Sequence, residues 1–76
     1  MEEILKTIIK NLVDNKDEVE IKEVEGEKNI IFEVKVAEGD MGKIIGRQGK
    51  IAQSIRTVMK AVANRKDKKV TVEFIG

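Results

Sequence analysis

The sequence predicts an α+β domain of two layers, in which three helices cover one face of a mixed three-stranded sheet. Segments 2–13 and 51–62 repeat their apolar residues every three or four positions, which is typical of amphipathic helices. Segments 19–21, 30–36 and 70–74 alternate apolar and polar residues, which is typical of strands with one buried face. With a short helix before the second long one, the order is helix, strand, strand, helix, helix, strand. A chain of 76 residues has room for one domain.

The first predicted helix has a continuous apolar face, formed by Ile4, Leu5, Ile8, Ile9, Leu12 and Val13. It should end near Asp14, Asn15 and Asp17, because these side chains compete for backbone hydrogen bonds and favour turns.

The next two segments predict a β-hairpin with a glycine in its loop. Three apolar pairs define the register: Val19 with Val36, Ile21 with Val34, and Val24 with Ile31. The first two pairs point to one face of the sheet, and the third lies on the opposite face, which is mostly polar. One face should therefore be buried and the other exposed.

The second half of the chain predicts two helices and a closing strand. Asp40 is a candidate N-cap for a short helix from Met41 to Ile45, which ends at Gly46. The longer helix runs to about Asn64, with an apolar face of Ile51, Ile55, Val58, Met59 and Val62. The strands before and after these helices should be parallel, because a right-handed crossover joins them.

The composition excludes several classes of function. The chain has no Cys and no His, so it has no thiol nucleophile and no usual zinc site, and no cofactor or small-molecule substrate is expected. Ser54 is the single Ser and lacks a His base, so an enzyme is not expected. No apolar run approaches the roughly 18 residues of a membrane span, and the acidic start at Met1 differs from a signal peptide. A cytoplasmic protein without a membrane partner is expected.

Charge is distributed unevenly along the chain. Residues 1–38 carry eleven acidic and six basic residues, a net charge of −5, whereas residues 39–76 carry nine basic and three acidic residues, a net charge of +6. This asymmetry indicates a positive surface for an anionic partner, or else attraction between the two halves within one fold.

Two glycines, Gly46 and Gly49, lie between the short and the long predicted helix. Glycine has no Cβ, so Gly46 can end a helix at positive φ, and both glycines permit the backbone of a ligand to approach closely. The N-terminus of the helix that follows favours an anion such as phosphate. Side chains that suit phosphate or base edges surround this turn: Lys43, Arg47, Gln48 and Lys50. A simple turn between two helices remains an alternative, and a DNA-binding helix-turn-helix is a weaker one because its core has no sheet.

The segment from Ile44 to Ile51, IIGRQGKI, resembles the signature of KH domains, in which a GXXG loop clamps the backbone of about four nucleotides. The order of elements is similar to the type II KH fold, so residues 1–76 would form a single KH domain. More narrowly, the chain is similar in length and in residues 12–15, 18–20 and 41–46 to the KhpA-like family of small bacterial RNA-binding proteins. Ala52 departs from many KH signatures, which have a large aliphatic residue at this position.

The resemblance implies that single-stranded RNA lies in a groove between the helices of the GXXG loop and a facing strand. One wall would carry the basic residues around the loop, and the other would be a variable loop that contains Arg65, Lys66, Lys68 and Lys69. Ile44 and Ile45 are candidates for contact with base faces, although core packing explains each of them more simply.

The resemblance also implies a post-transcriptional regulator or RNA chaperone that forms a homodimer, or a heterodimer with a larger KH protein of the Jag type. Phe32 and Phe74 are the only aromatic residues and both point inward in the predicted strands, so affinity and sequence specificity should be weak. The alternative is a protein-interaction module that has the KH fold but binds little RNA.

Overall fold

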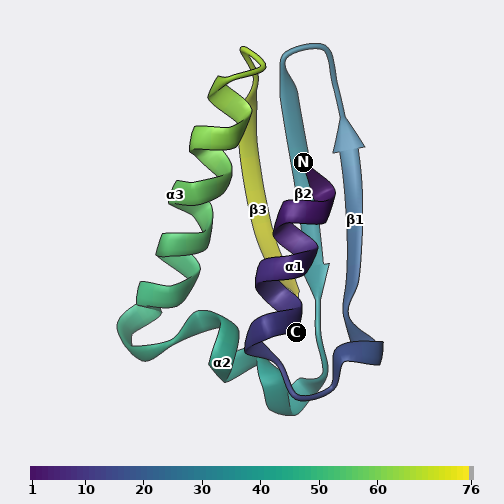
Figure 1. Ribbon diagram of the computed structural model, residues 1–76, viewed down its shortest axis with the longest axis vertical. Helices are drawn as coiled ribbons and strands as arrows, with labels where there is room; N and C mark the ends of the chain where they lie inside the picture. Colours follow the sequence, from purple (N-terminus) through teal and green to yellow (C-terminus); the bar gives the residue numbers. More distant parts are fainter. Residues whose placement is uncertain (76) are drawn as a thin grey trace.

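Three α-helices lie on one face of a three-stranded sheet in the computed structural model of the protein, which describes residues 1–75 (Figure 1). The helices and strands are α1 (Glu2–Leu12), β1 (Glu20–Glu25), β2 (Asn29–Lys35), α2 (Met41–Ile45), α3 (Lys50–Asn64) and β3 (Lys69–Ile75). Single 3-10 turns lie at Lys16–Glu18, Glu38–Asp40 and Arg47–Gly49. Among residues 1–75, no helix combines the length and the hydropathy needed to cross a bilayer. The predicted α+β class and order of elements are confirmed.

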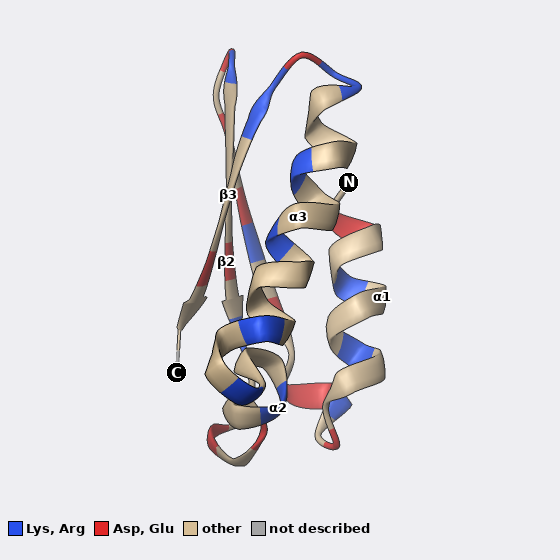
Figure 2. Ribbon diagram, turned by 90° about the vertical axis from the view of Figure 1, so that its left-hand side faces the viewer, with Lys and Arg blue, Asp and Glu red and all other residues tan. Residues whose placement is uncertain are grey.

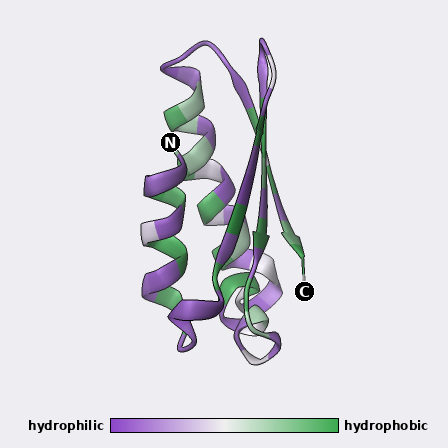
Figure 3. Cartoon of the chain, turned by 90° about the vertical axis from the view of Figure 1, so that its right-hand side faces the viewer, coloured by the Kyte–Doolittle hydropathy of each residue, from purple (hydrophilic) through white to green (hydrophobic). Residues whose placement is uncertain are grey.

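The sheet has the order β1-β2-β3, with β1 antiparallel to β2 and β3 parallel to β2, as the crossover predicts. Ile21 pairs with Val34 and Val24 with Ile31, which confirms the predicted hairpin register. Figure 3 shows the two layers edge-on, with hydrophobic and hydrophilic residues alternating along both. The face away from the helices leaves Val24 48% and Ile31 36% exposed, so the helices bury only one side of the sheet.

The core between the two layers is almost entirely aliphatic and surrounds one aromatic side chain, Phe32. Its fully buried members include Leu5 and Ile9 of α1, Ile44 of α2 and Met59 of α3. Every helix therefore contributes to a single core, as expected of a chain that has no disulfide or structural metal to stabilise it.

The buried face of α3 differs from the predicted one. Its buried residues are Ala52, Ile55, Met59 and Ala63, whereas Val58 is 44% exposed. Apolar residues cover a wider arc of this helix than the core can bury, and small alanine side chains let a helix pack closely against its neighbours. The prediction of Ile55 and Met59 as buried residues is confirmed, whereas the small side chains of Ala52 and Ala63 are buried and Val58 is not. Ala52 thus lies in the core.

Candidate nucleic-acid interface

The GXXG loop connects α2 to α3 in a conformation that depends on its glycines. Gly46 ends α2 at φ 73° and ψ 178°, and its N–H donates to the carbonyl oxygen of Gly42 at 2.9 Å. Gln48 at φ 58° and Gly49 at φ 73° are both left-handed, which turns the chain into the first residue of α3. Arg47 and Gln48 are consequently exposed at the tip of the loop.

The two glycines are required for different reasons. A Cβ on Gly46 would lie 2.5 Å from Cγ1 of Ile51, so the side chain of Ile51 already occupies the space that this Cβ would need. A Cβ on Gly49 would meet no heavy atom within 4 Å. The predicted close approach of a ligand therefore fits the open space at Gly49, whereas Gly46 makes room for Ile51.

Asp40 precedes α2 but does not cap it through its side chain, so the predicted role is wrong. Its carboxylate is 2% exposed and accepts hydrogen bonds from the backbone N–H of Asn15 at 2.9 Å and of Asp14 at 3.3 Å. The side-chain amide of Asn15 donates to it at 3.1 Å. These hydrogen bonds, above all that from the backbone of Asn15, hold the pKa of Asp40 below its ordinary value. Asp40 thereby fixes the end of α1 to the start of α2.

Lys43 extends from α2 toward the same acidic group. It forms an ion pair and hydrogen bond with Asp14, and its Nζ lies 3.6 Å from Oδ1 of Asp40. The hydrogen bond to Asp14 raises the pKa of Lys43. Lys43 is one of the cations predicted to surround the loop, and it already pairs with two carboxylates of the protein. Its contact with RNA stays a prediction, and the negative charge of these carboxylates would disfavour it.

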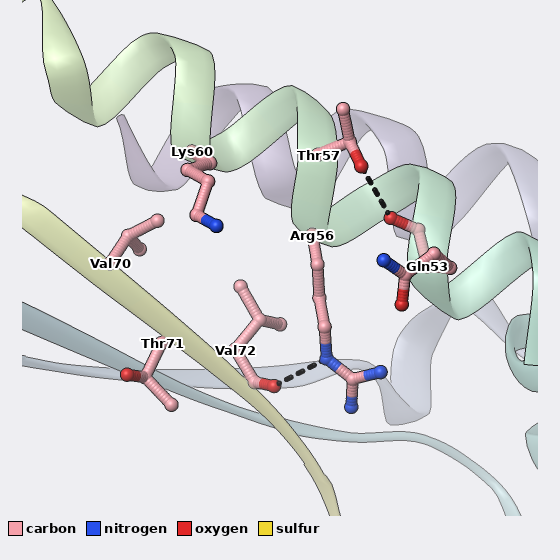
Figure 4. A pocket seen from close by; sticks show the side chains of 7 residues that line it. All are labelled: Gln53, Arg56, Thr57, Lys60, Val70, Thr71 and Val72. Atoms are coloured by element: carbon pink, nitrogen blue, oxygen red, sulfur yellow. Dashed lines mark hydrogen bonds between the residues drawn. The ribbon is translucent and has the colours of Figure 1, made fainter.

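A groove of about 240 Å³ runs between α3 and β3 (Figure 4). Its lining residues come from the exposed side of α3 and from β3: Gln53, Arg56, Thr57, Lys60, Val70, Thr71 and Val72. The helical members of this group were not predicted from the sequence. The pattern that indicates them is a polar stripe at three- and four-residue spacing on α3, opposite its apolar face.

The basic segment at residues 65–69 lies at the opposite end of α3 from the GXXG loop. The 15 residues of α3 separate the two by about 22 Å, and Figure 2 shows Lys and Arg residues at both ends of this helix and along it. Lys68 forms an ion pair with Glu25 and lowers the pKa of that carboxyl, and the N–H of Lys69 donates to the carbonyl oxygen of Lys28 at 2.9 Å. The two basic segments thus flank the ends of the groove and are not walls that face one another.

The two isoleucines considered for base contact have different environments. Ile44 is fully buried in the core, so its side chain is not available to a base, and core packing accounts for it. Ile45 is half-buried beside the loop and stays a candidate.

A second groove, of about 470 Å³, runs along the other side of α3, between this helix and α1. Most of its lining is aliphatic, with two polar side chains: Ile8, Leu12, Ile51, Ile55, Val58, Asn11 and Ser54. Ile4 of α1 is also 43% exposed. The helix α3 therefore separates a polar groove from an apolar one.

The order of elements, the mixed sheet and the glycine loop between α2 and α3 define a KH domain of type II. The family model described as "KhpA/KhpB, KH domain" matches residues 2–74. The chain belongs to this family, which is a family of KH domains and not of enzymes.

Bacterial relatives match over nearly the full length of the chain. The RNA-binding protein KhpA of Clostridium acetobutylicum is 57% identical over 75 residues, which cover 99% of this chain and 100% of the relative. The protein of that name from Chlamydia trachomatis is 49% identical, with 99% and 96% covered. The one from Borreliella burgdorferi is 45% identical over 73 residues, with 96% and 89% covered. No solved structure matches the chain.

Proposed function

We propose that the protein binds single-stranded RNA in the groove between α3 and β3, with the GXXG loop holding the sugar-phosphate backbone. The observation that carries this proposal is the loop itself, which exposes Arg47 and Gln48 beside the N-terminus of a 15-residue helix. The groove continues from this loop with two further cations, Arg56 and Lys60. Relatives that are named RNA-binding proteins support the same assignment.

Phosphate groups would contact Arg47, Gln48 and Lys50 at one end of the groove, and the cations of residues 65–69 at the other. Affinity and sequence specificity should be modest, because Phe32 is buried and Phe74 lies beneath the guanidinium of Arg56, so neither offers a free stacking surface. Such binding suits a cytoplasmic post-transcriptional regulator or RNA chaperone.

The decisive experiment replaces Arg47 and Gln48 with Asp and measures binding of a fluorescent single-stranded oligonucleotide by anisotropy. The exchange should weaken binding on the order of 100-fold, because it puts negative charges where phosphate lies. A matched control, Lys6→Asp with Lys22→Gln, lowers the net charge by the same three units at exposed sites away from the groove and should change binding far less. Wild-type affinity should fall with salt at a slope of about −0.7 per phosphate neutralised. Equal loss in both variants would contradict the assignment of the loop.

A second candidate function, association with another KH chain, is favoured by the apolar groove between α1 and α3. Val58 in its lining is 44% exposed, and Ile4, which precedes the lining residue Ile8 by one helical turn, is 43% exposed. Large aliphatic side chains grouped in this way are typical of contact surfaces. We propose that a second copy of the chain occupies this groove, which would make a homodimer. Sedimentation of the protein alone tests this, and a mixture with a larger KH protein of the Jag type shows whether a heterodimer replaces it.

A further inference from the structure

Arg56 lies in the middle of the groove between α3 and β3 and is held there by the strand. Its Nε donates to the carbonyl oxygen of Val72 at 3.3 Å, as Figure 4 shows. Its guanidinium carbon lies 5.1 Å from the centroid of the Phe74 ring, within the range of a cation–π contact. The guanidinium is therefore oriented before any ligand arrives.

Most of the hydrogen-bonding capacity of Arg56 is unused. The contact with Val72 takes one of its five N–H donors and leaves four on the two terminal nitrogens. Among residues 1–75, no carboxylate forms an ion pair with Arg56. The fork of the exposed guanidinium thus suits a partner with two acceptor atoms side by side.

The position of Arg56 in the groove favours a base as that partner. It follows Lys50, the first residue of α3, by six residues, or about 9 Å along the helix axis. An RNA backbone held at the GXXG loop would therefore extend its bases toward Arg56. The adjacent half-buried side chain of Val70 suits the flat face of a base. The groove volume of about 240 Å³ is below the range that encloses drug-sized ligands.

Of the two purines, guanine presents two adjacent acceptors, O6 and N7, to a guanidinium. Adenine has an amino donor in place of O6, which would face the donors of Arg56. We infer that Arg56 selects guanine over adenine at one position of the bound strand. This inference rests on the proposed RNA binding and deepens it, because it assigns a base preference to a groove that otherwise contacts backbone.

The experiment compares uridine-rich single-stranded oligonucleotides of equal length that carry one guanine or one adenine, moved along the sequence. The wild-type protein should bind the guanine form about ten- to a hundredfold more tightly at one position. In Arg56→Lys the charge remains, but the fork and its anchor on Val72 are lost, so the ratio of the two affinities should fall well below the wild-type ratio. The salt slope should stay near the wild-type value because the number of charges is unchanged, and any loss of affinity should be equal for the plain uridine strand and the adenine strand.

Base analogues test the same contact without changing the protein. In 7-deazaguanine the acceptor N7 is replaced by C–H, so the wild-type protein should lose most of its preference. Inosine retains O6 and N7 and lacks the amino group, so it should bind like guanine. In Arg56→Lys the differences in affinity among the three bases should shrink, which ties the effect to the guanidinium even if the variant is less stable.

The outcomes separate this inference from the proposed function. Binding without a guanine preference, or a preference that is undiminished in Arg56→Lys, would overturn the inference alone. A uniform loss of affinity in Arg56→Lys for every strand, with a smaller salt slope, would show a phosphate contact and overturn it as well. Absence of binding to any strand would overturn the proposed function together with this inference.

Discussion

The two grooves beside α3 have opposite chemistry although a single helix lines both. Toward β3 the helix presents Gln53, Arg56 and Lys60, whose polar ends remain in water, and toward α1 it presents Ile51 and Val58. A cationic groove suits a charged strand, and an apolar groove suits another protein surface. The difference teaches that two binding functions can occupy one helix without sharing a side chain. Substitutions should therefore separate them, except where a residue supports both grooves.

Gly46 is such a residue, and its replacement should have the largest effect. In Gly46→Ala the new Cβ would overlap with Ile51, which lines the apolar groove, at a backbone conformation that is strained for any L-residue. We expect a loss of about 3 kcal/mol in the free energy of unfolding, measured by urea denaturation, and damage to both functions.

Gly49→Ala is the matched control for Gly46→Ala. Gly49 has the same φ of 73° but a ψ of 13°, which strains an L-residue less than the ψ of 178° at Gly46, and its Cβ would meet open space. The expected cost is about 1 kcal/mol. An equal loss in both variants would show that contact with Ile51 contributes nothing.

Asp40→Asn should cause the next largest loss of stability. It places an amide donor among the N–H groups that donate hydrogen bonds to the carboxylate of Asp40. We expect the melting temperature to fall on the order of 10 °C at pH 7, measured by circular dichroism. The loss should extend to the apolar groove, since Asp40 fixes the end of α1, which forms one wall of that groove.

The pH dependence of stability provides a second test of Asp40. Its pKa in the folded state is below the ordinary value of 3.8, so its contribution is complete above that value and is lost as pH falls through the folded pKa. The difference in melting temperature between the wild type and Asp40→Asn should therefore shrink below pH 3.8. A difference that stays constant down to pH 2 would contradict the role of the carboxylate.

Val58→Lys should abolish self-association and leave the polar groove intact. A charge in an apolar contact surface loses its hydration, so the dissociation constant of the dimer should rise at least about tenfold, measured by sedimentation equilibrium. Thr57→Lys is the reciprocal control, because it adds the same charge to the neighbouring groove and should strengthen RNA binding without changing the dimer. Loss of RNA binding in Val58→Lys would show that the two functions are coupled.

Glu25→Gln should have the smallest effect. It releases Lys68 from its exposed ion pair at the far end of the polar groove. RNA affinity should rise about two- to threefold in low salt and be unchanged in high salt, because exposed pairs contribute little and are screened. Anisotropy titrations at two salt concentrations measure this change. Weaker binding would mean that Glu25 positions Lys68 for RNA.

Features that depend on neighbours in the sequence were predictable. The three- and four-residue spacing in α1, the alternation in β2 and the glycine that ends α2 act within a few residues, so the helix ends at Ile45 and Asn64 agree with the prediction. The hairpin register followed from apolar pairs that face each other across a short loop.

Features that depend on distant contacts were not predictable. The partners of Asp40 lie 25 and 26 residues away, and nothing in its local sequence distinguishes them from an N-cap. The burial of Ala52 instead of Val58 depends on how closely α3 approaches its neighbours. Arg56 was missed for the same reason, because Val72 and Phe74 lie on a strand whose position follows only from the complete fold.

The parallel pairing of β2 with β3 has a consequence for folding kinetics. Asn29 pairs with Lys69, so the chain must close a loop of about 40 residues before β3 finds its place. Contacts this far apart in sequence slow folding, and they form late because the loss of loop entropy precedes the gain in packing. The polar groove has β3 as one wall, so no partly folded chain that lacks this strand contains it. RNA binding should therefore appear only when the whole domain has folded, and it should disappear along the same denaturation curve.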